Sequence, residues 1–266
     1  MTKAILEIDK LSCGYGTKTI IRDVSLKVVD GEILSIIGPN GSGKTTLLKS
    51  ITNIVKSEKG KILFQGRMIQ SIPRNELARK VAVVGQAVEP AMMTVQEYIL
   101  LGRLPYFRKY QFMETRKDIL LAQRYMTLTD TDKLKDQLMS EVSSGERQLA
   151  SIARALVQEP ALLLLDEPTS HLDITHQAQI LGLIHRLNQE LGLTVLMVVH
   201  DLNLASEYSH RLVLLNKKDG HIYRTGTPEE VLTENAVRDI YDTPVIIGKN
   251  PLSGKPCIFL ATQNII

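Results

Sequence analysis

A glycine-rich segment in the first fifth of the sequence has the residue types needed to bind phosphate groups. Residues 38–45 are Gly-Pro-Asn-Gly-Ser-Gly-Lys-Thr, and they follow an apolar run at 33–37. Glycine has no Cβ, so backbone N–H groups can approach an anion closely. A helix that begins here presents its positive end to the same anion. The Lys44 ammonium would neutralise β- and γ-phosphate charge, and the Thr45 hydroxyl would ligate Mg²⁺. The pattern therefore predicts a site for a nucleoside triphosphate.

We expect a run of consecutive residues to contact the nucleotide in this segment. They are Gly38, Pro39, Asn40, Gly41, Ser42, Gly43, Lys44, Thr45 and Thr46. The competing interpretation is a glycine-rich turn with a lysine beside it. The pattern arises by chance in about one of a hundred chains of this length, and the flanking strand and helix patterns make a chance match rarer still.

Two adjacent acidic residues follow a second apolar run and could hydrolyse the triphosphate. Asp166 and Glu167 come directly after Leu162–Leu165. Successive side chains at a strand end point in different directions. We therefore expect Asp166 to hold Mg²⁺, directly or through water, and Glu167 to orient or deprotonate the attacking water. Two solvated acids at a strand end are the competing interpretation, which the phosphate loop in the same chain makes the weaker one.

The elements that must position these residues alternate between strands and helices. Short apolar runs predict strands at 33–37, 61–64, 81–84, 161–165 and 194–199. An alternating pattern at 5–8 and an apolar run at 24–29 add β-structure at the N-terminus, and a hairpin is expected over 212–223 around Asp219-Gly220.

Helical spacing dominates a long central stretch of the sequence. Residues from about 87 to 159 carry no strand signals, a helix is predicted over 173–191, and Thr227–Glu230 has a capping sequence for another. We predict an α/β fold with a mostly parallel sheet, an antiparallel β subdomain and an inserted α-helical subdomain. The expected boundaries are a core at about 1–86 and 160–266 and a helical subdomain at about 87–159, within a single domain over 1–266.

Composition limits the classes of protein that this chain can belong to. Hydrophobic residues make up 44% and charged residues 23% of 266 residues, and the formal net charge is +3. These values favour a globular protein and give no sign of nucleic-acid binding. The apolar runs are far below the roughly 18 residues of a membrane-spanning helix, and no secretory signal is expected. Cys13 and Cys257 form no disulfide framework. We expect a reduced, cytosolic protein, so any membrane role requires a partner chain.

Three further motifs distinguish among the proteins that contain phosphate loops. Val142–Gln148 (Val-Ser-Ser-Gly-Glu-Arg-Gln) precedes the acidic strand, Pro168–Asp173 (Pro-Thr-Ser-His-Leu-Asp) follows it, and His200 lies beyond. Together with the phosphate loop, these motifs resemble those of ABC transporter ATPases in type and order, over nearly the whole chain. The resemblance implies a P-loop NTPase fold with a RecA-like core, and ATP with Mg²⁺ as ligands.

The resemblance implies roles for four residues that their own patterns would not reveal. Tyr15 matches the aromatic residue that stacks on adenine, and Gln86 matches the glutamine that reaches Mg²⁺ and the attacking water. His200 matches the histidine that contacts the γ-phosphate, and Asp173 matches an aspartate at the dimer interface. Taken singly, Tyr15 could be a surface aromatic, Gln86 a polar strand end, and His200 a capping or buried histidine.

The resemblance implies a function for the segment at Ser143 in a dimer. The sequence of this segment differs from the one usual in the family. In this family two domains sandwich two ATP molecules, and each Ser143–Glu146 segment would complete the site of the other protomer. Ser143, Gly145 and a helix N-terminus would form this second anion cradle, with Glu146 among its predicted nucleotide contacts. The usual sequence is Leu-Ser-Gly-Gly-Gln, whereas this chain has Val142-Ser143-Ser144-Gly145-Glu146. Ser143 and Glu146 also fit a capping box, so we expect the segment to cap a helix as well.

Within the family the sequence is similar to importers of iron siderophores, haem and vitamin B12. The similarity lies at Thr94-Val95, Leu101–Arg103, Ser170–Asp173, His200–Asn203 and a tail at Asn250–Pro256 that resembles a C-terminal hairpin. This branch implies a homodimer, a polytopic membrane permease, a substrate-binding protein reached through the permease, and a peripheral location at the cytoplasmic face of the inner membrane. It implies no nucleic-acid partner.

Other functions stay open at this stage. Importers for zinc, manganese or molybdate share the motifs, and a soluble ABC ATPase is the alternative from another class, although such proteins usually carry two domains or a long coiled coil. A phosphate-loop kinase is the weakest alternative, because the segment around Ser143 would have no function in it. The basic and aromatic stretch Arg103–Tyr110 could suggest RNA, but we expect a loop near the membrane partner.

Overall fold

The computed structural model describes residues 3–86 and 91–261. The chain divides into two compact units. The first unit comprises Met1–Ser71 with Thr194–Ile266, and the second comprises Ile72–Leu193. Each unit contains both strands and helices, so the predicted mixed α/β class is confirmed.

An antiparallel sheet in the first unit has the strand order β2-β1-β4-β5. Its strands are β1 (Ala4–Tyr15), β2 (Lys18–Val29), β4 (Ser57–Phe64) and β5 (Arg67–Met68). Alternate residues Val24, Leu26 and Val28 of β2 are buried, as a strand with one covered face requires. The tight turn between β1 and β2 places Tyr15 at the end of a strand.

A second group of strands in the same unit has the order β10-β9-β3-β8. These are β3 (Ile33–Ile37), β8 (Thr194–Val198), β9 (Arg211–Leu215) and β10 (Ile222–Gly226). β3 runs parallel to both β8 and β9, and β10 returns antiparallel to β9, confirming the predicted hairpin. All residues of β3 are buried, because a central parallel strand is covered on both faces. The carboxyl ends of β3, β8 and β9 therefore share one edge.

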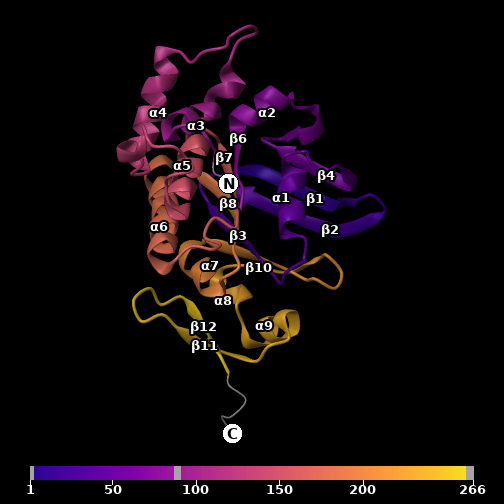
Figure 1. The fold of residues 1–266 in the computed structure, drawn as a ribbon. Helices are drawn as coiled ribbons and strands as arrows, with labels where there is room; N and C mark the ends of the chain where they lie inside the picture. The colour runs from indigo at the N-terminus through magenta and orange to yellow at the C-terminus, as the bar shows by residue number, and fades with distance from the viewer. Residues whose placement is uncertain (1–2, 87–90, 262–266) are drawn as a thin grey trace. The chain divides into compact units, whose positions relative to one another are not determined.

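Short helices and a terminal hairpin complete the first unit. The helices are η1 (Ile69–Ser71), α1 (Lys44–Ile51), α7 (Leu202–Tyr208), α8 (Pro228–Val231) and α9 (Glu234–Tyr241). The capping sequence predicted at Thr227 forms a complete capping box. β11 (Val245–Lys249) and β12 (Pro256–Leu260) pair antiparallel, drawn in yellow in Figure 1, and confirm the hairpin expected around residues 250–256.

The second unit combines two parallel strands with most of the long helices. β6 (Val81–Val84) pairs with β7 (Leu162–Asp166). The helices are α2 (Arg74–Lys80), α3 (Val95–Leu100), η2 (Leu101–Tyr106), α4 (Arg116–Leu128), η3 (Asp132–Leu134), α5 (Ser144–Leu156) and α6 (Ile174–Leu191). Within residues 3–86 and 91–261, no helix has the length and apolar character needed to cross a bilayer.

The stretch Arg103–Tyr110 differs from the loop expected there. Its first part belongs to η2, and Arg103 is only 4% exposed. The Arg103 guanidinium donates a 2.8 Å hydrogen bond to Asp118 of α4 and stacks 3.8 Å from the Tyr106 ring centre. A buried guanidinium with a carboxylate partner is part of the packing, so the prediction was wrong for Arg103.

The domain boundaries expected from the sequence stay a prediction. The compact units divide after Ser71 and after Leu193, whereas the helical pattern placed the limits at about 87 and 159. Residues 87–90, where the helical subdomain was expected to begin, lie outside the described residues.

Candidate nucleotide site

The loop after β3 has a backbone that only glycine adopts comfortably. Gly41 and Gly43 have φ angles of 81° and 95°, in the left-handed region that penalises a Cβ. Gly43 is the N-cap of α1, and a Cβ there would lie 2.6 Å from Ile21 Cδ1. The loop therefore lies against β2 and turns directly into a helix. This is the strand–loop–helix context that phosphate binding requires.

Two polar side chains are buried inside this loop. The Lys44 ammonium donates hydrogen bonds to the carbonyl oxygens of Gly38 (2.8 Å) and Pro39 (3.1 Å), and Lys44 is 5% exposed. The buried Ser42 hydroxyl has no hydrogen-bond partner among the described residues. Because an unpaired buried hydroxyl is costly, a phosphate oxygen is the kind of partner that this loop fits. Lys44 and Ser42, two of the predicted phosphate contacts, are thus both buried within the loop.

Tyr15 and His200 belong to the same unit as the loop. Tyr15 ends β1 and is 51% exposed, so its ring is accessible for stacking. His200 lies two residues beyond Val198, which pairs with Ile36 of β3. Because β3 and β8 are parallel, His200 and Gly38 leave the sheet at the same edge. The His200 side chain is exposed there.

The two acids and Gln86 come together in the second unit. β6 and β7 are parallel, with Val84 opposite Leu165, so Gln86 and Glu167 follow the two strand ends. The Gln86 amide donates a 2.6 Å hydrogen bond to a carboxylate oxygen of Glu167. Glu167 has a φ of 54°, an unusual value for a residue with a side chain and one that is frequent at functional sites. Asp166, the last residue of β7, is half-buried.

The predicted Mg²⁺ ligands offer only oxygen atoms, which is the donor type that this ion prefers. They are Thr45, Asp166 and Gln86. Mg²⁺ usually keeps several waters and binds one or two carboxylates together with phosphate oxygens. Across residues 3–86 and 91–261, no group of three or more His, Cys, Asp or Glu side chains could hold a metal ion. Oxygen donors of these types are those that Mg²⁺ binds together with phosphate oxygens.

The segment at Ser143 forms the capping box predicted from the sequence. The Ser143 hydroxyl accepts a 3.2 Å hydrogen bond from the Glu146 N–H, and the Glu146 carboxylate accepts a 2.8 Å bond from the Ser143 N–H. Hydrogen bonding of the Glu146 carboxylate by the Ser143 hydroxyl, and then by the Ser143 N–H, holds the pKa of Glu146 below its usual range, and the nearby His176 ring lowers it further. The segment thus begins α5 with a charged carboxylate at its N-terminus, where the helix dipole favours it.

His176, which the sequence patterns did not single out, connects this segment to Asp173. A Cβ on Gly145 would lie 2.0 Å from His176 Cδ2, so the ring lies directly on the Gly145 backbone. His176 Nδ1 is 3.0 Å from each carboxylate oxygen of Asp173, which also caps α6 by accepting from the His176 N–H at 2.9 Å. The Asp-x-x-His spacing at a helix start was a local signal for this pair. Its contact with Gly145 had no such signal.

Comparison with known proteins shows which family the chain belongs to. The family described as ABC transporter matches residues 21–170. The petrobactin import ATP-binding protein FpuD of Bacillus anthracis is 38% identical over 260 residues, which are 97% of this chain and 94% of that protein. The ferric enterobactin transport ATP-binding protein FepC of Escherichia coli strain K12 is 37% identical over 262 residues, covering 97% and 95% of the two chains.

Solved structures share the fold. An inward-facing ABC transporter designated as metal-chelate type superposes with a TM-score of 0.85 at 26% identity, covering 100% of both chains. The dimeric ATP-binding cassette MJ0796, in a post-hydrolysis state with ADP and phosphate, superposes with a TM-score of 0.71 at 27% identity, covering 84% of this chain and 98% of that one.

Proposed function

This chain belongs to the ABC transporter family, and from that membership we propose that it is the ATP-hydrolysing subunit of an importer for a metal chelate of the iron–siderophore type. The observation that carries the proposal is the extent of the similarity, since FpuD and FepC align with 97% of this chain and with 94% and 95% of their own lengths. Similarity of that extent is not confined to the phosphate loop, which kinases and GTPases also possess.

Hydrolysis is assigned to Glu167 with Gln86 as its positioning partner. The carboxylate of Glu167 accepts the proton of the attacking water, and the Gln86 amide, 2.6 Å away, orients that carboxylate. Lys44 and the backbone of residues 38–46 bind the phosphates, Tyr15 stacks on adenine, and His200 contacts the γ-phosphate. Bound Mg²⁺, held by Thr45 and Asp166 with help from Gln86, would neutralise phosphate charge.

Closure of a homodimer is assigned to the capped start of α5. Ser143 and Gly145 offer a hydroxyl and a backbone N–H at a helix N-terminus, which suits the γ-phosphate bound by a second copy of the chain. Asp173 contacts the His176 ring, which in turn lies on Gly145. The interface aspartate and the anion cradle are therefore connected through His176. Hydrolysis removes the shared γ-phosphate and loosens the dimer.

The membrane itself is supplied by partners in this proposal. The dimer binds the cytoplasmic side of a polytopic permease in the inner membrane, and a substrate-binding protein delivers the chelate from the other side. The cargo makes no contact with this subunit, so the cargo assignment follows from the relatives named FpuD and FepC.

Glu167→Gln tests the assignment of the chemistry. The variant keeps an oxygen that can accept from Gln86 but cannot take a proton, so hydrolysis should fall at least about a hundredfold while ATP still binds and holds a dimer. Steady-state phosphate release and light scattering with ATP measure the two effects. Glu190→Gln, at an exposed acid of α6, is the matched control. Normal hydrolysis, or a monomer in saturating ATP, would contradict the assignment.

Isolation of the intact membrane complex tests the transport function. The tagged chain should co-purify with a multi-spanning permease, and the permease or its binding protein should retain an iron(III) chelate identified by mass spectrometry. Recovery of zinc, manganese or molybdate instead would show that the importer carries that cargo and not an iron(III) chelate. Recovery of the chain with no membrane protein, in detergent that keeps such complexes intact, would overturn the function.

A further inference from the structure

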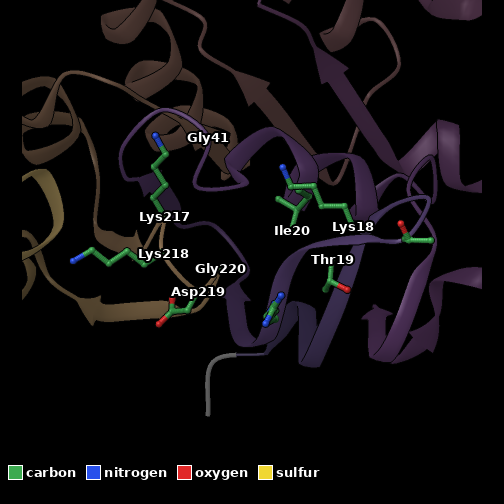
Figure 2. Close-up of a pocket in the computed structure, with 10 residues that line it drawn as sticks. Lys18, Thr19, Ile20, Gly41, Lys217, Lys218, Asp219 and Gly220 are labelled. Atoms are coloured by element: carbon green, nitrogen blue, oxygen red, sulfur yellow. The ribbon is translucent and has the colours of Figure 1, made fainter.

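A cavity in the first unit adjoins the phosphate loop and has a volume of about 550 Å³ (Figure 2). Three segments line it: residues 17–20 and Arg22, at the β1–β2 turn and the start of β2; Gly41 of the loop; and residues 217–220 in the turn between β9 and β10. β9 pairs with β3 in parallel, with Leu214 opposite Ile37. The turn after β9 and the loop after β3 therefore leave the sheet at the same edge, which explains why they meet.

The cavity carries more positive than negative charge. Its basic lining residues are Lys18, Arg22, Lys217 and Lys218, and its acidic one is Asp219. Asp219 is already engaged, since its carboxylate accepts a 3.1 Å hydrogen bond from the His221 N–H. The structure shows no ion pair or side-chain hydrogen bond within 3–86 and 91–261 for the four basic residues. Unpaired cations that line a recess favour an anionic ligand.

Lys217 is the basic residue that reaches the phosphate loop. Its Cε lies 3.6 Å from the position of a Cβ on Gly41. In Figure 2 its amino end lies beside the loop at Gly41, whereas the neighbouring Lys218 points away from that loop. The two lysines therefore differ in what they can touch, although both are exposed and adjacent in sequence.

The turn that carries Lys217 is held firmly in place. The Gly220 N–H donates to the Asn216 carbonyl at 3.1 Å, and the Arg22 N–H donates to the Gly220 carbonyl at 3.1 Å. A Cβ on Gly220 would lie 2.1 Å from the Ile20 carbonyl oxygen, so this close approach to β2 requires glycine. These backbone contacts hold the turn next to β2, so a contact from Lys217 requires its side chain to become ordered but requires no rearrangement of the turn.

We propose that Lys217 contacts the phosphate chain of the bound nucleotide, so that the β9–β10 turn forms a second wall of the nucleotide site. This inference rests on the proposed function, since it takes the ligand to be ATP or ADP. Lys217 is a binding and positioning residue here, with no part in proton transfer. Its contact serves ATP and ADP alike, because both carry α- and β-phosphates.

Lys217→Met removes the charge and keeps an unbranched side chain. Calorimetry on the full-length chain should show the Kd for both ATP and ADP rising about three- to tenfold, with adenosine unaffected because it lacks phosphate. In the ATPase assay KM should rise while kcat stays unchanged, as for a group that binds ground and transition states equally. Lys217→Arg should restore most of the affinity, and Lys218→Met, the matched control, should change Kd by less than about twofold.

The outcomes separate this inference from the function on which it rests. Wild-type affinity in Lys217→Met, or an equal loss in Lys217→Met and Lys218→Met, overturns the contact and leaves the nucleotide function standing. A loss that extends to adenosine also overturns it, because the turn would then act through folding. If the wild-type chain binds neither ATP nor ADP, the proposed function is wrong as well.

Discussion

One added methyl group at Gly145 tests how the start of α5 is packed. In Gly145→Ala the new Cβ would lie 2.0 Å from Cδ2 and 2.5 Å from Cγ of His176, closer than any real contact. The ring must therefore rotate or the helix must shift. Either movement strains the bonds between His176 Nδ1 and the Asp173 carboxylate, both 3.0 Å long.

The expected loss of stability follows from two opposing terms. Forcing a methyl group into an occupied space costs about 1–3 kcal/mol. Alanine favours a helix over glycine by at most about 1 kcal/mol, and by less in a first turn, where Gly145 lies. We expect a net loss of about 1–2 kcal/mol, or about 2–4 °C in Tm for a chain of this size.

Urea unfolding of matched variants measures this loss. Gly182→Ala in α6 is the control, because a Cβ there would have no atom within 4 Å, so the same substitution should stabilise by about 0.5–1 kcal/mol. Adding His176→Ala to Gly145→Ala should recover about 1 kcal/mol relative to the summed single effects. A Gly145→Ala variant as stable as the wild type, or one with no coupling to His176, would refute the packing argument.

Three further predictions concern other parts of the chain. Lys44→Ala should weaken nucleotide binding at least about tenfold by calorimetry, and unchanged affinity would mean that the phosphates bind elsewhere. Asp118→Ala removes the carboxylate that accepts from Arg103, while the 2.8 Å bond to the Val157 carbonyl and the Glu159 carboxylate at 3.7 Å remain; unfolding by denaturant should therefore show a loss of about 2–3 kcal/mol, and a loss below about 1 kcal/mol would contradict the buried pair. Because the folded pKa of Glu146 is lowered, its stabilising contribution is complete above the ordinary glutamate value of about 4.3 and is lost as pH falls through the folded pKa. The stability difference between wild type and Glu146→Gln should therefore shrink on acidification, and a difference that grows in acid would contradict this sign.

Motifs whose parts lie close together in the sequence were predictable. The capping box at Ser143 needs only two residues three positions apart, because its hydrogen bonds close within one helical turn. The strands at 33–37 and 81–84 were predicted to the residue, since short runs dominated by apolar residues are typical of parallel strands. The roles of Tyr15, Gln86 and His200 came from family resemblance and stay predictions.

Contacts between distant segments had no local signal. Arg103 belongs to a basic and aromatic stretch that indicated a surface loop, yet its guanidinium is buried because α4 brings Asp118 to it. The sequence motifs indicated Gln86 and Glu167 separately. Only the pairing of β6 with β7 places the Gln86 amide nitrogen 2.6 Å from a carboxylate oxygen of Glu167.

Short stretches of sequence specify the chemistry available to this protein: the phosphate loop, the acids after a buried strand, and the capped start of α5 each depend on hydrogen bonds and backbone angles within a few residues. The contact of His176 with Gly145 and that of Lys217 with Gly41 arise only in the folded chain. Those contacts depend on strand register and helix packing, which sum many weak interactions along the whole chain, so no short pattern of residues encodes them.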